Sequence, residues 1–425
     1  MFELEKIKSW LASQSESVKA NKKIAYHTGI LFASAIIVSL FGLITKGIQT
    51  RALTPEYYGL YAFFTTLTGF SVIFFHVGLF PTVELILASN HDQERERELF
   101  GTSIILAFFV GIFYSLSLLI LSFFIDVWFH LEFGYILRLV VPLCFIFPLR
   151  LLISFIAIGA NKVTYSAWFD ILVQVLFSIL LAFCFYYSDL SLIKILYISL
   201  GASLISLIVV LFLFKPSFKN FNRRFSEIKA KNKEYGLHVY IASIFTEISY
   251  RADEFLITYF ISATLLGYYS LANIICSPMV VLSVSASSSL FKKLANDKII
   301  HPKIFAFNYA WIVISFVILY LFADKVVVIL LGNNFLDVSK YIMPLAVVYI
   351  FKTLQQPYAF LTAKGLGKEI KNIAFAEGLV SVVANVICIP VWGVIGAVYA
   401  GALARLIGFL GRRYYYQKYL SANNL

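Results

Sequence analysis

The chain has 425 residues, of which 60% are hydrophobic and 14% are Asp, Glu, Lys or Arg, and its mean hydropathy is +0.84. These values lie outside the range of water-soluble domains and indicate a protein that folds mainly in lipid. The net charge of +12 does not indicate nucleic-acid binding, because no stretch long enough for a folded soluble domain carries the basic residues.

Apolar runs of about 20 residues recur from end to end, each long enough to cross a hydrocarbon core of about 30 Å. Proline residues inside the fourth, eighth and tenth runs predict kinks there. The chain is thus predicted to be an all-α integral membrane protein with twelve transmembrane helices, at residues 24–45, 57–80, 100–125, 135–158, 165–187, 192–214, 237–261, 266–290, 304–322, 341–363, 372–391 and 393–411.

Most of the 35 Lys and Arg residues collect on one side of these spans, which is the cytoplasmic side if the N-terminus is cytoplasmic. This distribution predicts a multi-pass protein with both termini in the cytoplasm and with affinity for anionic membrane lipid. Few bases are expected on or near the opposite side, namely Lys46, Arg51, Lys194, Lys325 and Lys340.

Three segments outside the spans are assigned to the cytoplasmic side. Residues 1–23 have a short amphipathic pattern without a signal-peptide core, which predicts an uncleaved interfacial helix. Residues 215–236 form a basic linker, and residues 412–425 form a C-terminal tail. Four widely spaced Cys residues and six scattered His residues give no disulfide framework and no metal-ligand spacing, so neither a metal nor a cofactor is expected.

The second half of the chain repeats the first. "EYYGLYAFFTTLTG" (residues 56–69) resembles "TLLGYYSLANIICS" (residues 264–277), and the match aligns Gly59 with Gly267. Two later matches in the same order align Arg150 with Lys352 and Asp170 with Glu377. The repeat predicts two pseudo-symmetric six-helix lobes, residues 24–214 and 237–411, joined by the basic linker.

Polar residues form a stripe on the fifth span that is repeated on the eleventh. The spacing of four residues places each trio on one helix face. These trios are Asp170, Gln174 and Ser178, and Glu377, Ser381 and Asn385. Hydrogen bonding that only holds the bundle together would explain the Ser, Asn and Gln residues. An acid inside a span points instead to a water-filled cavity or a charged partner, so Asp170 and Glu377 are candidate ion-coupling residues.

The stretch "SYRADEFLITY" (residues 249–259) places several charges in the seventh span. Glu247, Arg251 and Glu254 share one helix face, while Asp253 points elsewhere. Exposure of four charges to lipid would cost about 10 to 14 kcal/mol, so most of them must be enclosed. They are either a structural ion-pair network or part of a transport pathway, in which the three acids bind a coupling cation and Arg251 binds an anionic substrate.

Two further bases, Arg150 in the fourth span and Lys352 in the tenth, occupy equivalent places in the two halves. They are therefore expected to face a shared central cavity and to contribute to substrate binding. The spans contain similar numbers of acids and bases, so the sequence does not determine the net charge of that cavity.

Three motifs resemble the bacterial polysaccharide flippases, including the O-antigen flippases, of the multidrug/oligosaccharidyl-lipid/polysaccharide exporter superfamily. They are "TRALTPEYYGLYAF" (residues 50–63), "ADEFLITYFISATLLGYYSLA" (residues 252–272) and "PVWGVIGAVYAGALARLIG" (residues 390–408). The resemblance extends in order over nearly the whole chain, and it matches Asp253 to an Asp of the family pattern.

The resemblance implies two six-helix lobes around a central cavity that opens alternately to each side of the bacterial inner membrane. The implied cargo is an oligosaccharide repeat unit linked to undecaprenyl pyrophosphate, moved to the periplasmic leaflet and driven by a proton or sodium gradient. Arg150, Arg251 and Lys352 would bind the pyrophosphate or acidic sugars. Asp253 and its neighbours would carry the coupling cation, and a polysaccharide polymerase is a further implied partner.

Two alternatives stay open at this point. A multidrug or cation antiporter of the same superfamily would share the fold and the buried acids. An O-antigen ligase or polymerase would be an enzyme of the same pathway, but the longest predicted outer loop, residues 323–340, lacks a convincing catalytic constellation. No catalytic residue is therefore predicted.

Overall fold

The computed structural model describes residues 34, 36–90 and 92–423, which are mostly helical and contain no strand. The predicted interfacial segment 1–23 lies outside the described residues. The first half comprises the helix of residues 36–52, α2 (Pro55–Ser71), η1 (Val72–Phe74), α3 (Leu79–Ala88), α4 (Gln93–Leu121), α5 (Ile125–Phe129), α6 (Gly134–Val140), η2 (Val141–Leu143), α7 (Ile146–Gly159), α8 (Val163–Tyr187) and α9 (Leu192–Phe214).

The linker region contains α10 (Phe221–Lys231) and the π-helical turn η3 (Asn232–Gly236). The second half comprises α11 (Leu237–Phe260), α12 (Ala263–Cys276), α13 (Pro278–Ser289), α14 (Phe291–Asn296), α15 (Pro302–Leu331), η4 (Asn333–Val338), α16 (Ser339–Leu354), η5 (Gln356–Tyr358), α17 (Ala359–Ala363) and α18 (Gly367–Ala422).

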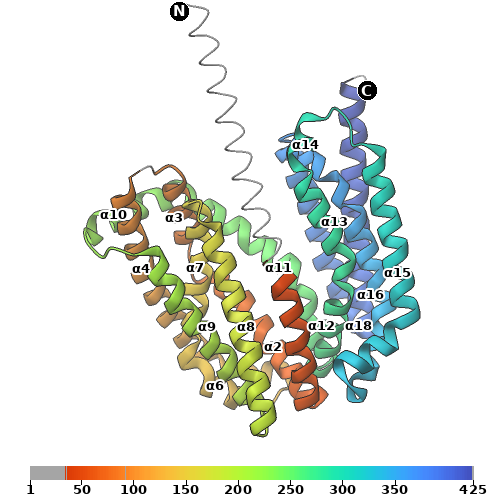
Figure 1. Ribbon diagram of the computed structural model, residues 1–425, viewed down its shortest axis with the longest axis horizontal. Helices are drawn as coiled ribbons and strands as arrows, with labels where there is room; N and C mark the ends of the chain where they lie inside the picture. The colour runs from red at the N-terminus through yellow and green to blue at the C-terminus, as the bar shows by residue number, and fades with distance from the viewer. Residues whose placement is uncertain (1–33, 35, 91, 424–425) are drawn as a thin grey trace, which may run out of the picture.

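These helices form two lobes, as the sequence repeat predicts. Figure 1 shows two bundles that meet around α2 and α12 and diverge toward α10 on one side and α14 on the other. The first lobe contains α3, α4 and α6–α9, and the second contains α13–α18. Helix α11 runs between the lobes and packs against both α2 and α18.

Twelve spans can be recognised in this arrangement. Seven helices of the described residues are long and apolar enough to cross a bilayer, and two bent helix pairs raise the number to nine. Helix α18 contains two spans that are separated at Gly393, whose φ of +62° breaks the helix at the predicted turn. Helix α11 and the helix of residues 36–52 complete the set. The four charges of α11 and the short described length of the other helix explain why length and composition do not select them.

The kinks predicted from proline are present. The fourth span bends by 52° between α6–η2 and α7, and the eighth bends by 46° between α12 and α13, which begins at Pro278. The tenth span breaks into α16, η5 and α17 around Pro357. Proline lacks the N–H that continues a helix, and its ring clashes with the preceding turn, so each break lies close to such a residue.

Helices α2 and α12 make a close crossing at the glycines that the repeat aligns. A Cβ atom on Gly59 would lie 2.3 Å from the carbonyl oxygen of Ala263, and one on Gly267 would lie 3.0 Å from the Cα atom of Gly59. Two helix backbones can approach this closely only where both lack side chains. The equivalent second helices of each half therefore meet at the interface between the lobes.

Further contacts join the lobes at the same end of the molecule. The Arg51 guanidinium donates to the carbonyl oxygens of Ile329, at 2.7 Å, and Leu330, at 3.3 Å, in the last turn of α15. A cation stabilises a helix C-terminus because the last carbonyls have no partner within the helix. The fully buried ring of Phe335 packs edge-on against Tyr58 and Tyr268 from the two equivalent helices.

At the opposite end, the linker folds onto the first lobe. The Glu98 carboxylate accepts hydrogen bonds from Arg224 Nε at 2.8 Å and from Asn220 Nδ2 at 2.6 Å. Arg224 also donates to Glu227 at 2.9 Å, and Arg95 pairs with the same carboxylate. These five residues, the linker clasp, fix α10 against the start of α4.

We predict that Gly59→Ala destabilises the protein by about 1–3 kcal/mol, because the added methyl group would overlap the α12 backbone. The midpoint of thermal unfolding of the purified protein in detergent measures the effect. Gly201→Ala on α9 is the matched control, since no heavy atom lies within 4 Å of a Cβ atom there. Equal midpoints for the two variants would refute a tight crossing.

The linker clasp should weaken in acid, because it contains the Glu98 carboxylate. Hydrogen bonds from Arg224 and Asn220 lower the pKa of the Glu98 carboxyl below its ordinary value of 4.5. The stabilisation is therefore complete above pH 4.5 and is lost as the pH falls through the lowered pKa. Limited proteolysis of the linker should become faster in acid for the wild type. Glu98→Gln should show fast cleavage at neutral pH already, whereas Glu94→Gln, at an exposed neighbouring position, should behave as the wild type.

Candidate functional site

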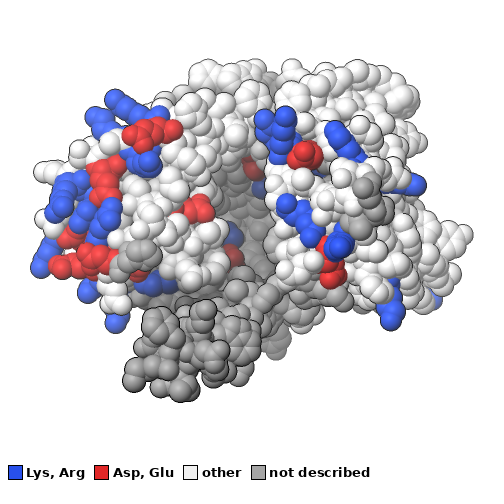
Figure 2. Space-filling model, turned by 90° about the horizontal axis from the view of Figure 1, so that it is seen from above, with Lys and Arg blue, Asp and Glu red and all other residues white. Residues whose placement is uncertain are grey.

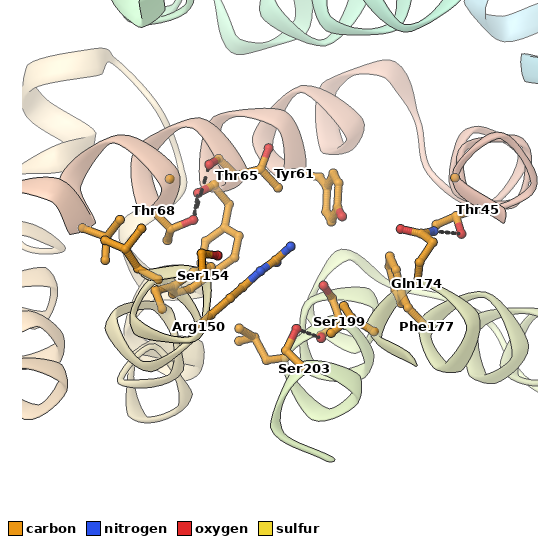
Figure 3. A pocket seen from close by; sticks show the side chains of 18 of the residues that line it. Thr45, Tyr61, Thr65, Thr68, Arg150, Ser154, Gln174, Phe177, Ser199 and Ser203 are labelled. Atoms are coloured by element: carbon orange, nitrogen blue, oxygen red, sulfur yellow. Dashed lines mark hydrogen bonds between the residues drawn. The ribbon is translucent and has the colours of Figure 1, made fainter. Parts of the chain in front are cut away.

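A cavity of about 440 Å³ lies within the first lobe. Its wall comes from the helix of residues 36–52, α2, α7, α8 and α9, and Arg251 of α11 also lines it. Figure 3 shows the Arg150 side chain extending from α7 toward Tyr61 of α2. Hydroxyl and amide side chains make much of the polar wall: Thr45, Tyr61, Thr65, Thr68, Ser154, Gln174, Ser199 and Ser203.

A second cavity of about 430 Å³ adjoins the first. The two share Arg150, Val173 and Gln174 as lining residues, so Arg150 stands at their common boundary. Asp170 lines the second cavity, and one of its carboxylate oxygens lies 3.7 Å from Arg150. The structure thus brings together Arg150 and Asp170, which the sequence analysis had assigned to separate roles.

The charges around the larger cavity are of one sign. Lys46, Arg150 and Arg251 line it, and no Asp or Glu does so among the described residues. Arg150 is 45% exposed and Arg251 is 34% exposed, so both guanidinium groups remain accessible. An accessible set of cations and neutral hydrogen-bonding groups suits an anion that also carries hydroxyl groups.

Lys46 is a lining residue that the sequence analysis missed. It was expected on the outer side, beyond a first span ending at residue 45, but the helix continues to residue 52. The Lys46 ammonium donates to Gln49 Oε1 at 3.0 Å and lies 4.7 Å from the centre of the Tyr61 ring. The i, i+4 spacing of Thr45 and Gln49 was the signal that could have extended the helix.

The predicted stripe on the fifth span holds the first helix in place. Gln174 Nε2 donates to Thr45 Oγ1 at 3.0 Å, and the hydroxyls of Thr45 and Ser178 are 2.7 Å apart. Two of the three stripe residues therefore have a packing role, as hydrogen bonds between membrane helices commonly do. The third stripe residue, Asp170, lines the second cavity instead.

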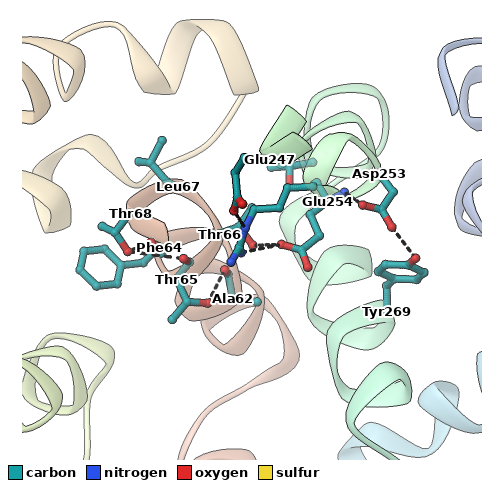
Figure 4. A network of polar contacts seen from close by, with 12 residues as sticks. Ala62, Phe64, Thr65, Thr66, Leu67, Thr68, Glu247, Asp253, Glu254 and Tyr269 are labelled. Atoms are coloured by element: carbon teal, nitrogen blue, oxygen red, sulfur yellow. Dashed lines mark hydrogen bonds and ion pairs between the residues drawn. The ribbon is translucent and has the colours of Figure 1, made fainter. Parts of the chain in front are cut away.

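The charge cluster on α11 joins the lobes. Arg251 forms an ion pair with Glu247 and lies 3.7 Å from a carboxylate oxygen of Glu254. The same oxygen of Glu254 accepts a hydrogen bond of 2.6 Å from the Thr66 hydroxyl on α2 (Figure 4). A Cβ atom on Gly69 would lie only 3.4 Å from Arg251. The cluster is enclosed between α11 and α2, with Arg251 reaching the cavity.

Asp253 has a different environment from its neighbours. Its carboxylate accepts a hydrogen bond of 2.6 Å from the Tyr269 hydroxyl on α12, as Figure 4 shows. Glu247, Arg251 and Glu254 thus face α2, whereas Asp253 faces the second lobe. The helical spacing had predicted this separation.

In the second lobe, Glu377 is fully engaged with cations. It is only 6% exposed, it forms an ion pair with Arg405, and Arg412 lies 3.5 Å away. Arg405 also stacks over the Tyr250 ring of α11 at 5.3 Å. The acid equivalent to Asp170 is therefore locked into a network that ties α18 to α11.

Lys352 lies apart from the other predicted binding residues. Its ammonium lies 4.6 Å from the centre of the Tyr349 ring, and it does not line either cavity described here. Arg150 and Lys352 therefore do not meet in this conformation, although they are equivalent in sequence.

The molecular surface is hollowed between the lobes. Figure 2 shows the α10 and α14 end of the molecule, with Lys, Arg, Asp and Glu clustered on both halves and charged atoms in the hollow between them. The lobes diverge at this end and are joined at the other, so access to the space between them comes from the charged end.

Comparison with known proteins gives a family and a fold. The sequence matches the family described as "Polysaccharide biosynthesis protein" over residues 24–295. The chain belongs to this family. The resemblance inferred from the sequence is thereby confirmed, and no curated protein matches the chain in a direct sequence search.

Several solved structures share the fold. An inward-facing multidrug resistance MATE family transporter of the MOP superfamily has a TM-score of 0.68 and 16% identity, over 90% of this chain and 96% of that one. An outward-facing MATE transporter has a TM-score of 0.57 and 16% identity, over 94% and 96%. The lipid II flippase MurJ, in an inward closed conformation, has a TM-score of 0.65 and 17% identity, over 91% and 87%.

The predicted all-α, twelve-helix, two-lobe fold is therefore confirmed. The three solved structures named above are of transporters and a flippase rather than of enzymes. Family and fold together support a multi-pass, flippase-type membrane transporter, and a multidrug exporter would share this architecture.

We predict that the α11 cluster has a structural and a binding component that can be separated. Arg251→Ala leaves Glu247 and Glu254 enclosed without their cation. It should cost about 2 kcal/mol of stability, less than a fully buried pair because the groups are partly exposed. The triple change Glu247→Gln, Arg251→Met and Glu254→Gln removes all three charges and should restore the thermal midpoint.

The triple variant should nevertheless remain inactive in transport, because the cavity has lost one of its three cations. Thermal unfolding and a flux assay on the same preparation distinguish the two components. Restored transport in the triple variant would show that Arg251 serves packing alone.

Proposed function

We propose that the protein is a flippase that moves oligosaccharide repeat units linked to undecaprenyl pyrophosphate from the cytoplasmic to the periplasmic leaflet of the bacterial inner membrane. The observation that carries this proposal is the cavity of the first lobe, lined by Lys46, Arg150 and Arg251 and by no described acid. A diphosphate needs such cations, and a glycan needs the surrounding hydroxyl and amide groups.

The chemistry of lipid crossing supports the same cargo. Sugar hydroxyls and a diphosphate cannot pass through hydrocarbon without losing their hydrogen bonds to water, at a cost of several kcal/mol for each group. A polar space between two lobes provides replacement partners along the path. The lipid tail can stay in the bilayer while the head group enters this space.

The structure corresponds to an inward-open state in this proposal. The positive-inside rule assigns the charged end, which carries α10 and α14, to the cytoplasm, and the hollow between the lobes opens at this end. Both termini would then be cytoplasmic. The higher TM-score with an inward-facing than with an outward-facing MATE transporter supports this assignment.

Transport would be coupled to the entry of a proton or sodium ion. Among the predicted ion-coupling acids, Asp253 and Glu254 on α11 are favoured, because this helix runs between the lobes and contacts both. Glu247 and Glu377 are held by arginines and are better suited to a structural role. A polysaccharide polymerase acting on the delivered units is a further proposed partner.

A multidrug exporter of the same superfamily is the second candidate, since its fold is the same. For a cationic cargo, a cavity lined by three cations is unfavourable. The α11 acids are the feature that would favour it.

Reconstitution into vesicles tests the proposal. The wild type should move a lipid-linked oligosaccharide to the opposite leaflet, where an added lectin detects the sugar, and should not transport a labelled cationic drug. Arg150→Ala should lower the flipping rate by at least about tenfold, as expected for loss of a charge-assisted contact to a phosphate. Arg138→Ala is the matched control, because Arg138 belongs to the same span but stacks on Phe123 outside the cavities.

Drug transport without oligosaccharide movement would reject the flippase assignment in favour of the exporter. Equal flipping rates for the two arginine variants would reject the cavity as the binding site.

A further inference from the structure

Asp170 and Glu377 are equivalent in the two halves of the sequence, but they differ in how tightly they are bound to partners. Glu377 is almost fully buried and pairs with two arginines. Asp170 is 49% exposed and makes no hydrogen bond with the described residues; its nearest charged partner among them is Arg150, at 3.7 Å. Of the five acids assigned to spans, Asp170 is the one without a hydrogen bond among the described residues.

Arg150, the partner of Asp170, is also held only loosely. Arg150 forms no hydrogen bond with the described residues. Its guanidinium lies 3.7 Å from the Asp170 carboxylate and 5.7 Å from the centre of the Phe169 ring. Its position at the boundary of the two cavities lets it face Asp170 on one side and the larger cavity on the other. The pair is therefore close enough to compensate charge but too loose to be fixed.

Arg150 is the one other charged residue of the described chain that lines the cavity containing Asp170. Among the described residues, the cavity that contains Asp170 is lined by Arg150 from α7 and by neutral side chains from α8 and the first helix, Ser34, Val38, Ser39, Val173 and Gln174. The next base, Lys46, lines the larger cavity and donates to Gln49. From α9, only the neutral Ser199, Leu200 and Ser203 reach the adjoining wall.

We propose that Asp170 is an internal counter-ion that competes with the anionic head group of the cargo for Arg150. This inference rests on the proposed function. In the empty transporter, Asp170 compensates the charge of Arg150. When a phosphate oxygen takes its place on Arg150, the released carboxylate no longer has a cation to itself among the described lining residues, and it takes up a proton from solvent. When the anion leaves, the proton returns to solvent and the pair forms again.

The exchange has a consequence for energy coupling. Proton uptake and head-group binding favour each other, because both require Asp170 to leave Arg150. A proton bound in this way accompanies the cargo outward, so it cannot supply the driving force of an inward gradient. The driving cation must bind to another acid, and Asp253 and Glu254 on α11 are the available ones.

Titration calorimetry on the purified full-length protein tests the exchange, with farnesyl diphosphate as the probe and farnesol as the uncharged control. Measurements at pH 6 in buffers of different ionisation enthalpy give the number of protons taken up for each diphosphate bound. The wild type should take up about one proton more than Asp170→Asn. The variant should bind the probe roughly five- to tenfold more tightly, because its internal competitor is gone.

Asp337→Asn is the matched control, since this exposed acid pairs with Lys340 outside both cavities and should give the wild-type proton number. Asp170→Ser serves as a second variant if Asp170→Asn does not fold. Diphosphate binding with equal proton numbers in the wild type and both Asp170 variants would overturn the exchange and leave the proposed function intact. Failure of the wild type to bind the probe, or unchanged binding by Arg150→Ala, would instead reject the cavity as the head-group site.

Discussion

The close crossing of α2 and α12 is the contact on which the two-lobed arrangement depends. Gly59 and Gly267 are equivalent in the two halves, and each lacks the side chain that would keep the helices apart. Because the crossing lies near one end, with Arg51 capping α15 beside it, the lobes are joined there and separate at the other end. A duplicated sequence thus produces a hollow that opens on one side only.

A second constraint is that every charge within the membrane must be compensated by protein or by a water-filled space. The α11 cluster meets it by pairing Arg251 with two acids and bonding Glu254 to α2. In the second lobe, Arg405 and Arg412 compensate Glu377. The first lobe meets the constraint differently, since Arg150 and Asp170 face cavities and are only loosely paired.

This difference between the lobes matters for function. Divergence after duplication has left one lobe with a closed ion-pair network and the other with an accessible set of cations. The proposed binding site therefore lies in the first lobe, with Arg251 of α11 as a further lining residue. Charges in the "SYRADEFLITY" stretch have two roles in this arrangement, because Arg251 lines the cavity while Glu254 bonds α11 to α2.

Much of this organisation could be predicted from the sequence. Hydropathy located the spans, proline located the kinks, and the repeat located the glycines that meet. The errors came where local patterns give weak signals. The first helix runs past the predicted end, so Lys46 was placed on or near the outer side. The linker was predicted only as a basic segment, and its helix α10 and buried Arg224 were not foreseen.

The sequence by itself determined the class of protein, the two-lobe plan and the presence of charges in the spans, because these follow from residue type and from spacing along single helices. Only the tertiary structure decided which charges on different spans are paired. Arg150 and Asp170 stand on different helices, and Glu377 and Arg405 stand on the two spans of α18 that the break at Gly393 separates. The helical period relates only residues of one continuous helix. Pairing between spans depends on how the bundle packs, which leaves Glu377 held by two arginines and Asp170 only loosely paired with Arg150.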